Sequence, residues 1–284
     1  MKYTPRSLED NVNVSRGHPL AELAWMLGGV VALMGVLVVA LGLATDVAVE
    51  KLPLRAEIGL GQQLLGRFPG DENPALEQRL KALLDRLPAD SPLQAYPFHV
   101  YLSNSQEVNA LALPGGNIVV YSGLLKQVES ENELSMVLAH ELGHFAHRDH
   151  LRGLGRGLGL AVAVSLLFGS DSAAGDVVSN TLLTFQSGYS RHQESAADRF
   201  ALDLLVRRYG HAGGAVGFFE RLRRDAGARL PYLLASHPHP QARVDELNER
   251  IRANGYPVAA VVPLAADIID ATTRGSASPR ADGT

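Results

Sequence analysis

The five residues His-Glu-Leu-Gly-His at 140–144 place the strongest constraint on what this chain can fold into. Residues four apart share one face of an α-helix, so a helix here would direct the imidazoles of His140 and His144 to one point, with Glu141 beside them. Two imidazole nitrogens on one face are typical of a zinc-binding helix. The same pattern also arises by chance in residues that only pack or face solvent, so the rest of the chain has to decide between these interpretations.

The surrounding sequence predicts that this segment is helical. Ser130 followed by Glu133 has the form of a capping box, which predicts where the helix begins. Apolar side chains then recur at helical spacing and predict its buried face: Leu134, Leu138, Leu142 and Phe145. Both the start of the helix and the side that faces a core are therefore encoded locally.

The composition limits the classes of protein to which the chain can belong. Its 284 residues, 46% hydrophobic and 20% charged, are enough to bury a sizeable core. A formal net charge of -4 and an isoelectric point near 6.2 do not provide the basic surface of a nucleic-acid binder, so no nucleic-acid partner is expected. The chain has no cysteine, so a zinc site has to be built from histidine and carboxylate ligands.

A long apolar run from Leu23 to Leu43 contains no charged side chain and follows a polar segment at 1–22. A helix of this length spans about 30 Å, the thickness of the hydrocarbon core of a bilayer. We therefore predict a transmembrane anchor at 23–44. A cleaved signal peptide is the alternative, because Gly42-Leu43-Ala44 resembles a cleavage site. The polar lead is long, however, and the apolar run exceeds the usual signal core of about 7–15 residues.

Basic residues on either side of the run set its expected orientation. Lys2, Arg6 and Arg16 precede it, while Lys51 and Arg55 follow closely. This small excess favours a cytoplasmic N-terminus under the positive-inside rule. We expect a single-pass protein of the inner cell membrane, with the remainder of the chain on the periplasmic or extracytoplasmic side.

The sequence at 45–270 predicts one mainly helical α+β domain, with a small sheet beside the predicted zinc helix. Strands are predicted at 97–102, 109–113 and 117–121, the last two joined by a glycine-rich turn. Further helices are predicted at 47–68, 74–87, 211–226 and 240–253, and from about 177 through 208 with a break near Gly188.

Three other segments carry weaker patterns. The apolar run at 160–168 is too short for an ordinary second membrane span, which leaves a core helix, an interfacial segment or a mobile flap. The small and polar residues at 169–176 indicate a loop. The composition of 271–284 is typical of a disordered tail.

A catalytic zinc needs three protein ligands and an open position, so one ligand remains to be found. His150 has the spacing of the third histidine of the metzincins. That class has a glycine where His147 stands and requires a downstream methionine, yet no methionine follows Met136. The metzincin interpretation therefore fails, and we expect His150 to be an ordinary surface residue.

A better third ligand is Glu194, four residues before Asp198 in a segment that reads as helix. On one helical face, Glu194 can reach the metal while Asp198 accepts a hydrogen bond from a ligand imidazole and fixes its orientation. The alternative is an ordinary helix with solvated carboxylates. It is less favoured because Ala196 and Ala197 leave the helix slim beside them, and because the two histidines otherwise lack a third ligand.

The chain resembles the membrane-associated gluzincin peptidases of the CAAX-prenyl-protease and HtpX heat-shock-protease family over roughly residues 50–255. Four ordered motifs carry the resemblance: Asn-Ala-Leu-Ala-Leu-Pro-Gly-Gly at 109–116 with Tyr-Ser-Gly-Leu-Leu at 121–125, Ala-His-Glu-Leu-Gly-His at 139–144, Tyr-Ser-Arg-x-x-Glu-x-x-Ala-Asp at 189–198, and His237-Pro238 with Arg243. Several transmembrane helices are usual in those members. One convincing span indicates the single-anchor branch, and prenylated substrates are not favoured.

The resemblance implies a role for each matching residue. His140, His144 and Glu194 would bind one zinc ion, Glu141 would be the catalytic base, and Asp198 would hold a ligand imidazole. His237, with Arg243 six residues later, would lie at the cleft and donate to the oxyanion. The strand formed by Asn109, Ala110, Leu111, Ala112 and Leu113 would pair with an extended substrate.

These roles predict a zinc-dependent endopeptidase that cleaves protein or peptide substrates with a metal-activated water. The resemblance implies a use in quality control of membrane or envelope proteins. The alternative is a catalytically silent, zinc-containing chaperone or binding module at the membrane. It is less favoured because structural zinc sites usually have four protein ligands, whereas three are expected here together with a retained base.

Overall fold

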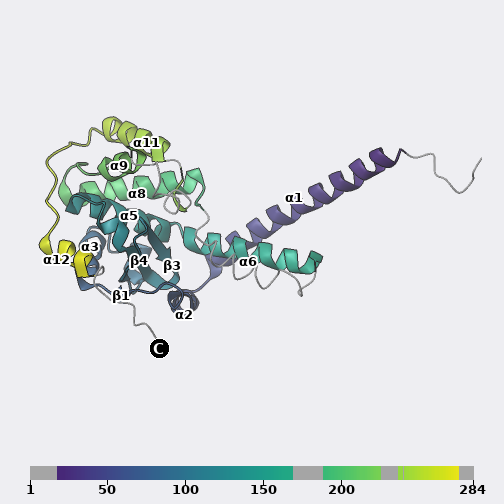
Figure 1. The fold of residues 1–284 in the computed structure, drawn as a ribbon, viewed down its shortest axis with the longest axis horizontal. Coiled ribbons are helices and arrows are strands. Elements are labelled where there is room, and N and C mark those ends of the chain that lie inside the picture. Colours follow the sequence, from purple (N-terminus) through teal and green to yellow (C-terminus); the bar gives the residue numbers. More distant parts are fainter. Residues whose placement is uncertain (1–17, 169–187, 225–235, 239, 275–284) are drawn as a thin grey trace, which may run out of the picture. The chain divides into compact units, whose positions relative to one another are not determined.

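The computed structural model describes residues 18–168, 188–224, 236–238 and 240–274 (Figure 1). The chain divides into two compact units, 1–44 and 45–284, and each is considered by itself. Helix α1, Pro19–Lys51, makes up the described part of the first unit and continues into the second.

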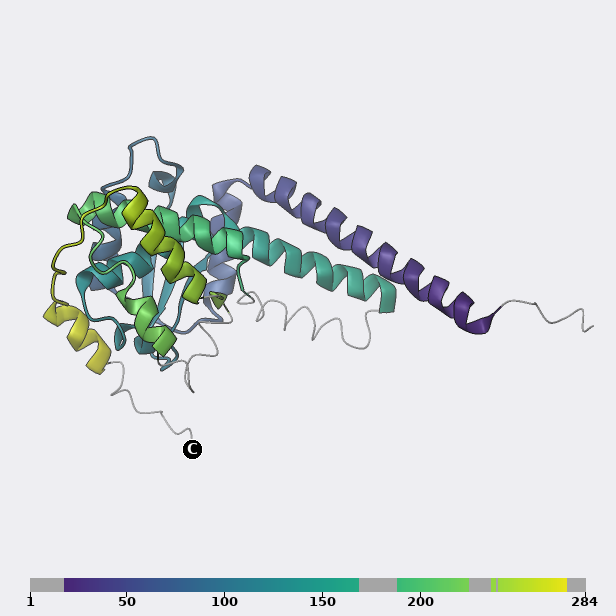
Figure 2. The same ribbon diagram turned by 90° about the horizontal axis from the view of Figure 1, so that it is seen from above.

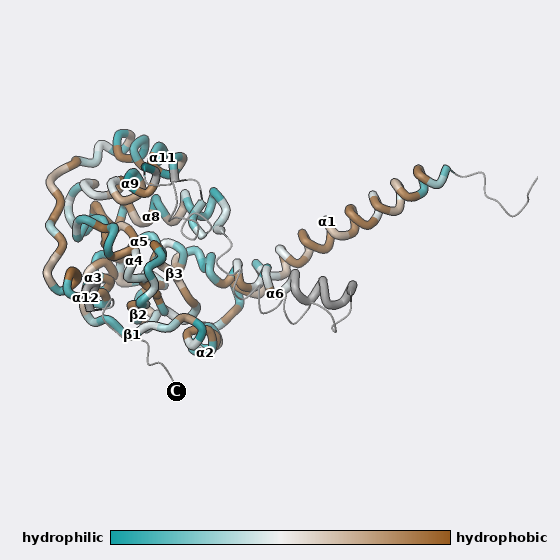
Figure 3. Tube along the Cα trace, viewed as in Figure 1, coloured by the Kyte–Doolittle hydropathy of each residue, from teal (hydrophilic) through white to brown (hydrophobic). Residues whose placement is uncertain are grey.

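Helix α1 contains the apolar run that predicts a membrane anchor. Hydrophobic residues follow one another along most of its length (Figure 3). By length and composition it is the one helix among the described residues that is suited to cross a membrane. The structure extends the predicted span at both ends, because the helix begins at Pro19 and ends at Lys51.

The second unit contains a four-stranded sheet in the order β1-β2-β4-β3. Strand β2 pairs in parallel with β4, and the other two neighbouring pairs are antiparallel. The three predicted strands are present, and a two-residue strand at the outer edge of β2 was not predicted. The strands are β1 Asp71–Glu72, β2 His99–Ser103, β3 Ala110–Leu113 and β4 Asn117–Tyr121.

A tight turn joins β3 to β4. Gly115 and Gly116 have φ values of 79° and 91°, which side chains other than glycine rarely adopt. Helix α2, Leu54–Leu65, packs so closely on this turn that a Cβ atom at Gly61 would lie 2.0 Å from the carbonyl oxygen of Pro114. Contact with α2 at this turn therefore fixes the position of the edge strand β3.

The remaining helices enclose α5, Glu131–Ala146, whose side chains are buried from Glu131 through Phe145. Figure 1 shows α5 between the sheet and α8, Arg191–Tyr209, and Figure 2 gives the view from above. The other helices of the second unit are α3 Pro74–Leu84, α4 Ser122–Leu125, α6 Asp149–Phe168, α9 Gly217–Arg224, α11 Pro240–Ala253 and α12 Ala266–Arg274, with short 3-10 turns at Pro92–Ala95 and Pro114–Gly116. The predicted α+β fold, mainly helical with a small sheet, is confirmed.

Several predicted helix boundaries are wrong. The segment 47–68 is divided, because α1 ends at Lys51 and α2 starts after Pro53. Helix α9 starts at Gly217 rather than 211, since Gly214 adopts φ 87° just before it. Helix α12 reaches Arg274, inside the segment whose composition predicts a tail. The predicted loop at 169–176, the predicted helix start near 177 and the rest of the tail lie outside the described residues.

The start of α5 follows half of the predicted capping box. Ser130 accepts a hydrogen bond from the backbone N–H of Glu133 at 3.2 Å. The Glu133 carboxylate does not return to Ser130. It accepts instead from the backbone N–H of Glu129 at 2.8 Å and pairs with Arg221. The helix therefore begins where the sequence predicts, although a charged partner distant in sequence takes the second half of the motif.

Glu57 is fully buried at the centre of a polar network. Its carboxylate accepts from Nη2 of Arg148 at 2.8 Å and the hydroxyl of Tyr96 at 2.9 Å, and it pairs with Nε2 of His150 at 2.9 Å. It also accepts from the backbone N–H of Gly115 at 3.2 Å. The prediction of a surface His150 is therefore wrong, because the residue is 0% exposed and bound to Glu57.

Arg148 ties the end of α1 to the start of α6. Its guanidinium donates to the carbonyl oxygens of Val49 at 2.6 Å and Leu52 at 2.9 Å. Val49 lies in the last turn of α1, where carbonyl groups lack the usual partner four residues further on, and Leu52 directly follows the helix. One turn further along α6, Arg152 pairs with Asp46 at 2.7 Å. The last turns of α1 are thus part of the second unit.

We predict that Glu57→Gln destabilises the folded protein by about 3–5 kcal/mol near neutral pH, because it removes one partner of buried charges. Burial alone would raise the pKa of Glu57, but His150 and Arg148 outweigh it and lower the pKa to about 2. Because this pKa is lower in the folded than in the unfolded protein, the carboxylate stabilises the fold at pH values above its ordinary pKa. The stability deficit of Glu57→Gln should therefore shrink as the pH falls from about 5 towards 2. Denaturant unfolding in detergent measures this difference in the free energy of unfolding.

The matched control is Glu249→Gln, which removes the same charge from an exposed position of α11. It should change the free energy of unfolding by less than about 0.5 kcal/mol. A deficit of the same size in both variants, or one that is independent of pH, would contradict a stabilising role for the buried carboxylate.

Candidate metal centre

The metal centre is formed where α5 and α8 approach each other. A Cβ atom at Gly143 would lie 2.8 Å from the Cα atom of Ala197, so the two backbones are close because neither residue carries a large side chain. Helix α8 begins with a full capping box, in which Ser190 and Gln193 exchange hydrogen bonds. This cap places Glu194 in the first turn of α8, facing α5.

Four buried side chains bring their ligand atoms together: His140, His144, Glu194 and His237, all within 4.8 Å of one another. Nε2 of His140 lies 3.1 Å from Nε2 of His144 and 3.6 Å from Oε2 of Glu194. Nε2 of His144 lies 3.4 Å from Oε1 of Glu194. Ligand atoms of a tetrahedral zinc, each about 2.0–2.1 Å from the ion, lie about 3.3–3.4 Å apart, so this donor set fits the metal.

The second nitrogen of each α5 histidine contacts a carboxylate. Nδ1 of His140 lies 2.9 Å from Oδ1 of Asp198, and Nδ1 of His144 lies 3.0 Å from Oδ2 of Asp149. An Nδ1–H that donates to a carboxylate fixes the tautomer and leaves Nε2 as a ligand atom. The sequence pattern predicts the contact with Asp198. The sequence analysis did not identify Asp149. Its position one turn beyond His144, just after α5 ends, is the feature that could have indicated it.

The charges around the cluster match this arrangement. Burial would raise the pKa of Asp198, but Arg243, with both oxygens of the carboxylate at 2.7 Å, lowers it to about 2. Burial opposes a charge on His144, yet Asp149 and Glu194 outweigh it and raise its pKa to about 9. Metal binding to His144 therefore has to displace a proton.

Glu194 keeps an oxygen available for coordination. Burial alone would raise its pKa, but His237 and Arg243 hold the pKa well below the usual range, so the residue is a carboxylate. Its Oε2 lies 2.8 Å from Nη1 of Arg243, without a hydrogen bond to it. Arg243 therefore offsets part of the charge on this oxygen, which accepts no hydrogen bond within the described residues.

Glu141 lies beside the donor set without belonging to it. Burial raises its pKa, and its Oε2 atom is buried without a hydrogen-bond partner. A cavity of about 20 Å³ adjoins it, lined by Ala110, His140, His237 and five further side chains of α4, α5, α9 and α11. About 10–15 Å³ suffices for one water molecule. The space next to the Glu141 carboxyl group therefore has the size of a single water.

His237 lies in contact with the predicted metal ligands, whereas the sequence predicts only that it faces the open coordination position. Its Nδ1 lies 3.0 Å from Oε1 of Glu194 and 3.2 Å from Nε2 of His140. Its Nε2 lies 3.8 Å from Oε1 of Glu141. His237 can thus act as a fourth ligand as well as a hydrogen-bond donor, which sequence spacing alone did not reveal.

Tyr189 covers another side of the cluster. Its ring stacks on the imidazole of His144 with centroids 3.7 Å apart and an interplanar angle of 18°. Its backbone N–H donates to the carbonyl oxygen of Ser236 at 3.1 Å. Tyr189 belongs to a motif recognised in the sequence, but a motif gives no indication of which ring stacks on which ligand.

The predicted substrate strand, 109–113, lies at the sheet edge beside α5. Ala110 lines the cavity next to Glu141, whereas Leu111 and Leu113 pack on the opposite face of the sheet. Asn109 is fully buried, and its Oδ1 accepts from the Ser236 hydroxyl at 3.2 Å. The strand is therefore connected to the segment that carries His237.

Comparison with known proteins identifies the family of this chain. The family described as Peptidase family M48 matches residues 73–251. The beta-barrel assembly-enhancing protease of Yersinia pestis is 29% identical over 216 residues, which cover 70% of this chain and 44% of that protein. Metalloprotease YcaL of Escherichia coli is 33% identical over 159 residues, 54% of this chain and 61% of YcaL.

Metalloprotease LoiP of Escherichia coli is 28% identical over 192 residues, 64% of this chain and 73% of LoiP. Of the Yersinia relative, by contrast, the chain spans less than half the length. The family match covers β2, β3 and β4, both helices of the donor cluster and the segment with His237 and Arg243. On this match, and with a donor set that fits a metal, the chain belongs to peptidase family M48.

Proposed function

We propose that this protein is a zinc-dependent endopeptidase with one ion per chain, held by His140, His144 and Glu194. The observation that carries the proposal is the spacing of these three donors, 3.1 to 3.6 Å between neighbouring ligand atoms, with an unpaired Glu141 carboxyl oxygen beside them. An ordinary buried polar cluster would pair its members. Here Oε2 of Glu141 and Oε2 of Glu194 accept no hydrogen bond within the described residues, and a bound cation would compensate their charge.

When bound, zinc supplies Lewis acidity that polarises the scissile carbonyl and lowers the pKa of the attacking water towards neutrality. Glu141 accepts the proton from that water as its oxygen adds to the acyl carbon. Glu141 then delivers the proton to the amine nitrogen as the C–N bond breaks. Its raised pKa suits a group that takes up and releases a proton near neutral pH.

We propose that an extended substrate adds to β3, the last strand of the sheet. Strand β3 is at the end of the sheet, and the backbone N–H of Tyr121 donates to the carbonyl of Asn109. In an antiparallel pair the inward and outward backbone groups alternate, so those of Ala110 and Ala112 are directed away from β4. The N–H of Ala110 donates to Oδ1 of Asn109 at 3.0 Å, which leaves the C=O of Ala110 and both backbone groups of Ala112 for a substrate. Main-chain pairing accepts many sequences, which suits protein substrates in general.

The names of the relatives suggest where such an activity is used. The Yersinia protein is named for enhancing the assembly of beta-barrels. We propose quality control of membrane or envelope proteins as the role of this chain as well. The β3 edge supports that role because it binds the backbone rather than a particular side chain.

The fourth donor favours a second possibility. With His237 the cluster has four protein donors, the number typical of structural zinc sites, which have no open position. A catalytically silent zinc module at the membrane would fit that set. The endopeptidase is favoured, because a silent site has no use for a buried Glu141 with a free oxygen next to a water-sized cavity.

We predict that Glu141→Gln abolishes peptide hydrolysis but leaves zinc bound, because the residue lies beside the donor set rather than in it. Zinc content and cleavage of an unfolded protein substrate in detergent measure both properties. Glu194→Ala is the matched contrast and should lose zinc and activity together. Turnover above a few per cent of the parent in Glu141→Gln would contradict the assignment of Glu141 as the catalytic base. Tight, stoichiometric zinc in Glu194→Ala would contradict the assignment of Glu194 as a ligand.

We predict that His237→Ala lowers the maximal rate by about 10–1,000-fold, as expected when a donor to the oxyanion is lost, with nearly unchanged zinc content. His239→Ala should do much less and serves as the control. Loss of zinc would instead identify His237 as a required ligand. A faster variant would show that His237 occupies the position that the substrate needs.

We propose that the catalytic unit lies on the extracytoplasmic side of the inner membrane, since one more basic residue precedes the apolar run than closely follows it. A cysteine introduced at Ser276 should then react with an impermeant thiol reagent once the outer envelope is opened. Labelling only after the inner membrane is broken would reverse the orientation. Soluble protein that starts near Thr45 would show that the helix is a cleaved signal.

A further inference from the structure

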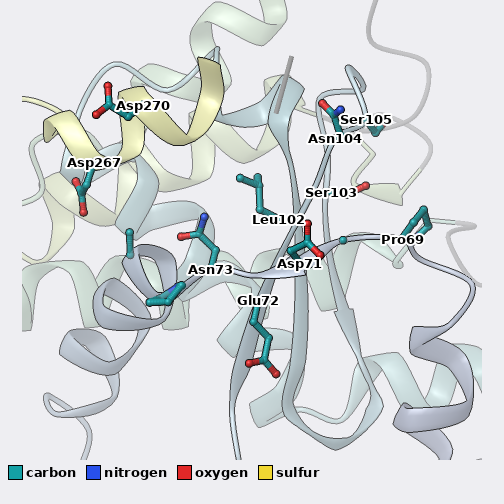
Figure 4. Close-up of a pocket in the computed structure, with 13 residues that line it drawn as sticks. Pro69, Asp71, Glu72, Asn73, Leu102, Ser103, Asn104, Ser105, Asp267 and Asp270 are labelled. Atoms are coloured by element: carbon teal, nitrogen blue, oxygen red, sulfur yellow. The ribbon is translucent and has the colours of Figure 1, made fainter. Parts of the chain in front are cut away.

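A groove of about 1040 Å³ runs along the β1 edge of the sheet, opposite the β3 edge (Figure 4). We call it the β1 groove. It is lined by the turn before β1, by β1 itself, by the end of β2 with the residues that follow it, and by α12: residues 69–75, 102–105, Asp267 and Asp270. Two strands, β2 and β4, separate β1 from β3, so the β1 groove is distinct from the metal centre.

The β1 groove is acidic. The described part of its lining includes the carboxylates of Asp71, Glu72, Asp267 and Asp270 and no lysine, arginine or histidine. Glu72 accepts from the Tyr101 hydroxyl at 3.3 Å and lies 3.6 Å from Nδ1 of His99. Asp267 is already paired with Arg79 at 2.8 Å. Asp71 is exposed, and within the described residues its side chain has no hydrogen bond or ion pair. The unneutralised charge of this lining is therefore negative and complements a basic ligand.

The backbone of β1 can accept another strand. The N–H of Asn73 donates to the carbonyl of Val100 at 2.8 Å, and Glu72 is paired with Tyr101 in the antiparallel register. Because inward and outward groups alternate along such a pair, the N–H and C=O of Glu72 are directed to the free edge. An extended peptide at this edge would find main-chain partners as well as carboxylates.

The floor of the β1 groove adds an independent observation. Ser103 is 6% exposed and lines the groove, yet its hydroxyl makes no hydrogen bond within the described part of the chain. Leu102 lies next to it and provides an apolar surface (Figure 4). A nearly buried hydroxyl without a partner is one that a bound ligand would satisfy.

We propose that the β1 groove binds an extended, lysine- or arginine-containing segment of a protein substrate, at a distance from the bond that is cleaved. The segment pairs with the β1 edge, directs a basic side chain to Asp71, and places apolar side chains on Leu102. That the bound segment belongs to a substrate rests on the proposed function, whereas the binding of a basic segment does not. A site of this kind selects substrates by charge without altering the chemistry at the metal centre.

Binding to the full chain in detergent tests the proposal directly. The probe is a short fluorescent peptide of alternating lysine and valine, followed by anisotropy, with a glutamate-valine peptide for comparison. Asp71→Asn should weaken binding about two- to fivefold and Asp71→Lys about tenfold, because exposed ion pairs are weak individually. Binding should weaken further as ionic strength rises from about 0.05 to 0.3 M. Glu249→Lys, on α11, should have no effect.

Cleavage provides a second test with a different readout. Two peptides that share one scissile sequence are compared, one of them with a lysine-valine extension. Asp71→Asn should raise KM for the extended peptide about two- to fivefold and leave its kcat, and both constants for the short peptide, unchanged.

Three results would overturn the proposal: equal binding of the basic and acidic peptides, unchanged binding in Asp71→Lys, or displacement of the peptide by micromolar calcium, which would identify a cation site instead. Failure of the parent to cleave either peptide would count against the proposed function alone, since the anisotropy measurement does not depend on catalysis.

Discussion

The close contact of α5 with α8 at Gly143 and Ala197 is the constraint on which the rest of the site depends. A carboxylate on α8 can share a metal ion with two histidines on α5 only if the helix backbones lie nearer than larger side chains allow. The capping box at Ser190 then fixes the rotation of α8, which directs Glu194 and Asp198 towards α5. Small residues and a local cap therefore supply the precision that metal coordination requires.

Burial makes the charge balance of this site demanding. Around the donor set lie four carboxylates, those of Glu141, Asp149, Glu194 and Asp198, and one guanidinium, that of Arg243, all nearly inaccessible to water. With neutral imidazoles the carboxylates exceed the guanidinium by three negative charges. An uncompensated charge is costly in such surroundings, and a divalent cation offsets most of this excess. Without the metal, a proton on His144, whose pKa is raised to about 9, offsets part of the same excess.

The parts that the sequence could predict are those encoded by neighbouring residues. Helical spacing identifies α5, alternating apolar runs identify β2, β3 and β4, and a separation of four places Glu194 and Asp198 on one face. The rest depends on partners far away in the chain. His150 is buried because Glu57 meets it from α2, and β1 exists only because β2 offers it an edge. No local pattern encodes such encounters, and they account for the errors described above.

One small sheet presents two free edges with different chemistry. The backbone groups of Ala110 and Ala112 at the β3 edge lie beside the metal centre, where pairing fixes the course of a substrate and is indifferent to its side chains. At the β1 edge the proposed pairing would take place among carboxylates, which discriminate by charge. A protease that accepts many sequences at the cleaved bond gains selectivity if recognition is moved elsewhere. A sheet with its metal centre at one edge and an acidic groove at the other separates cleavage from selection.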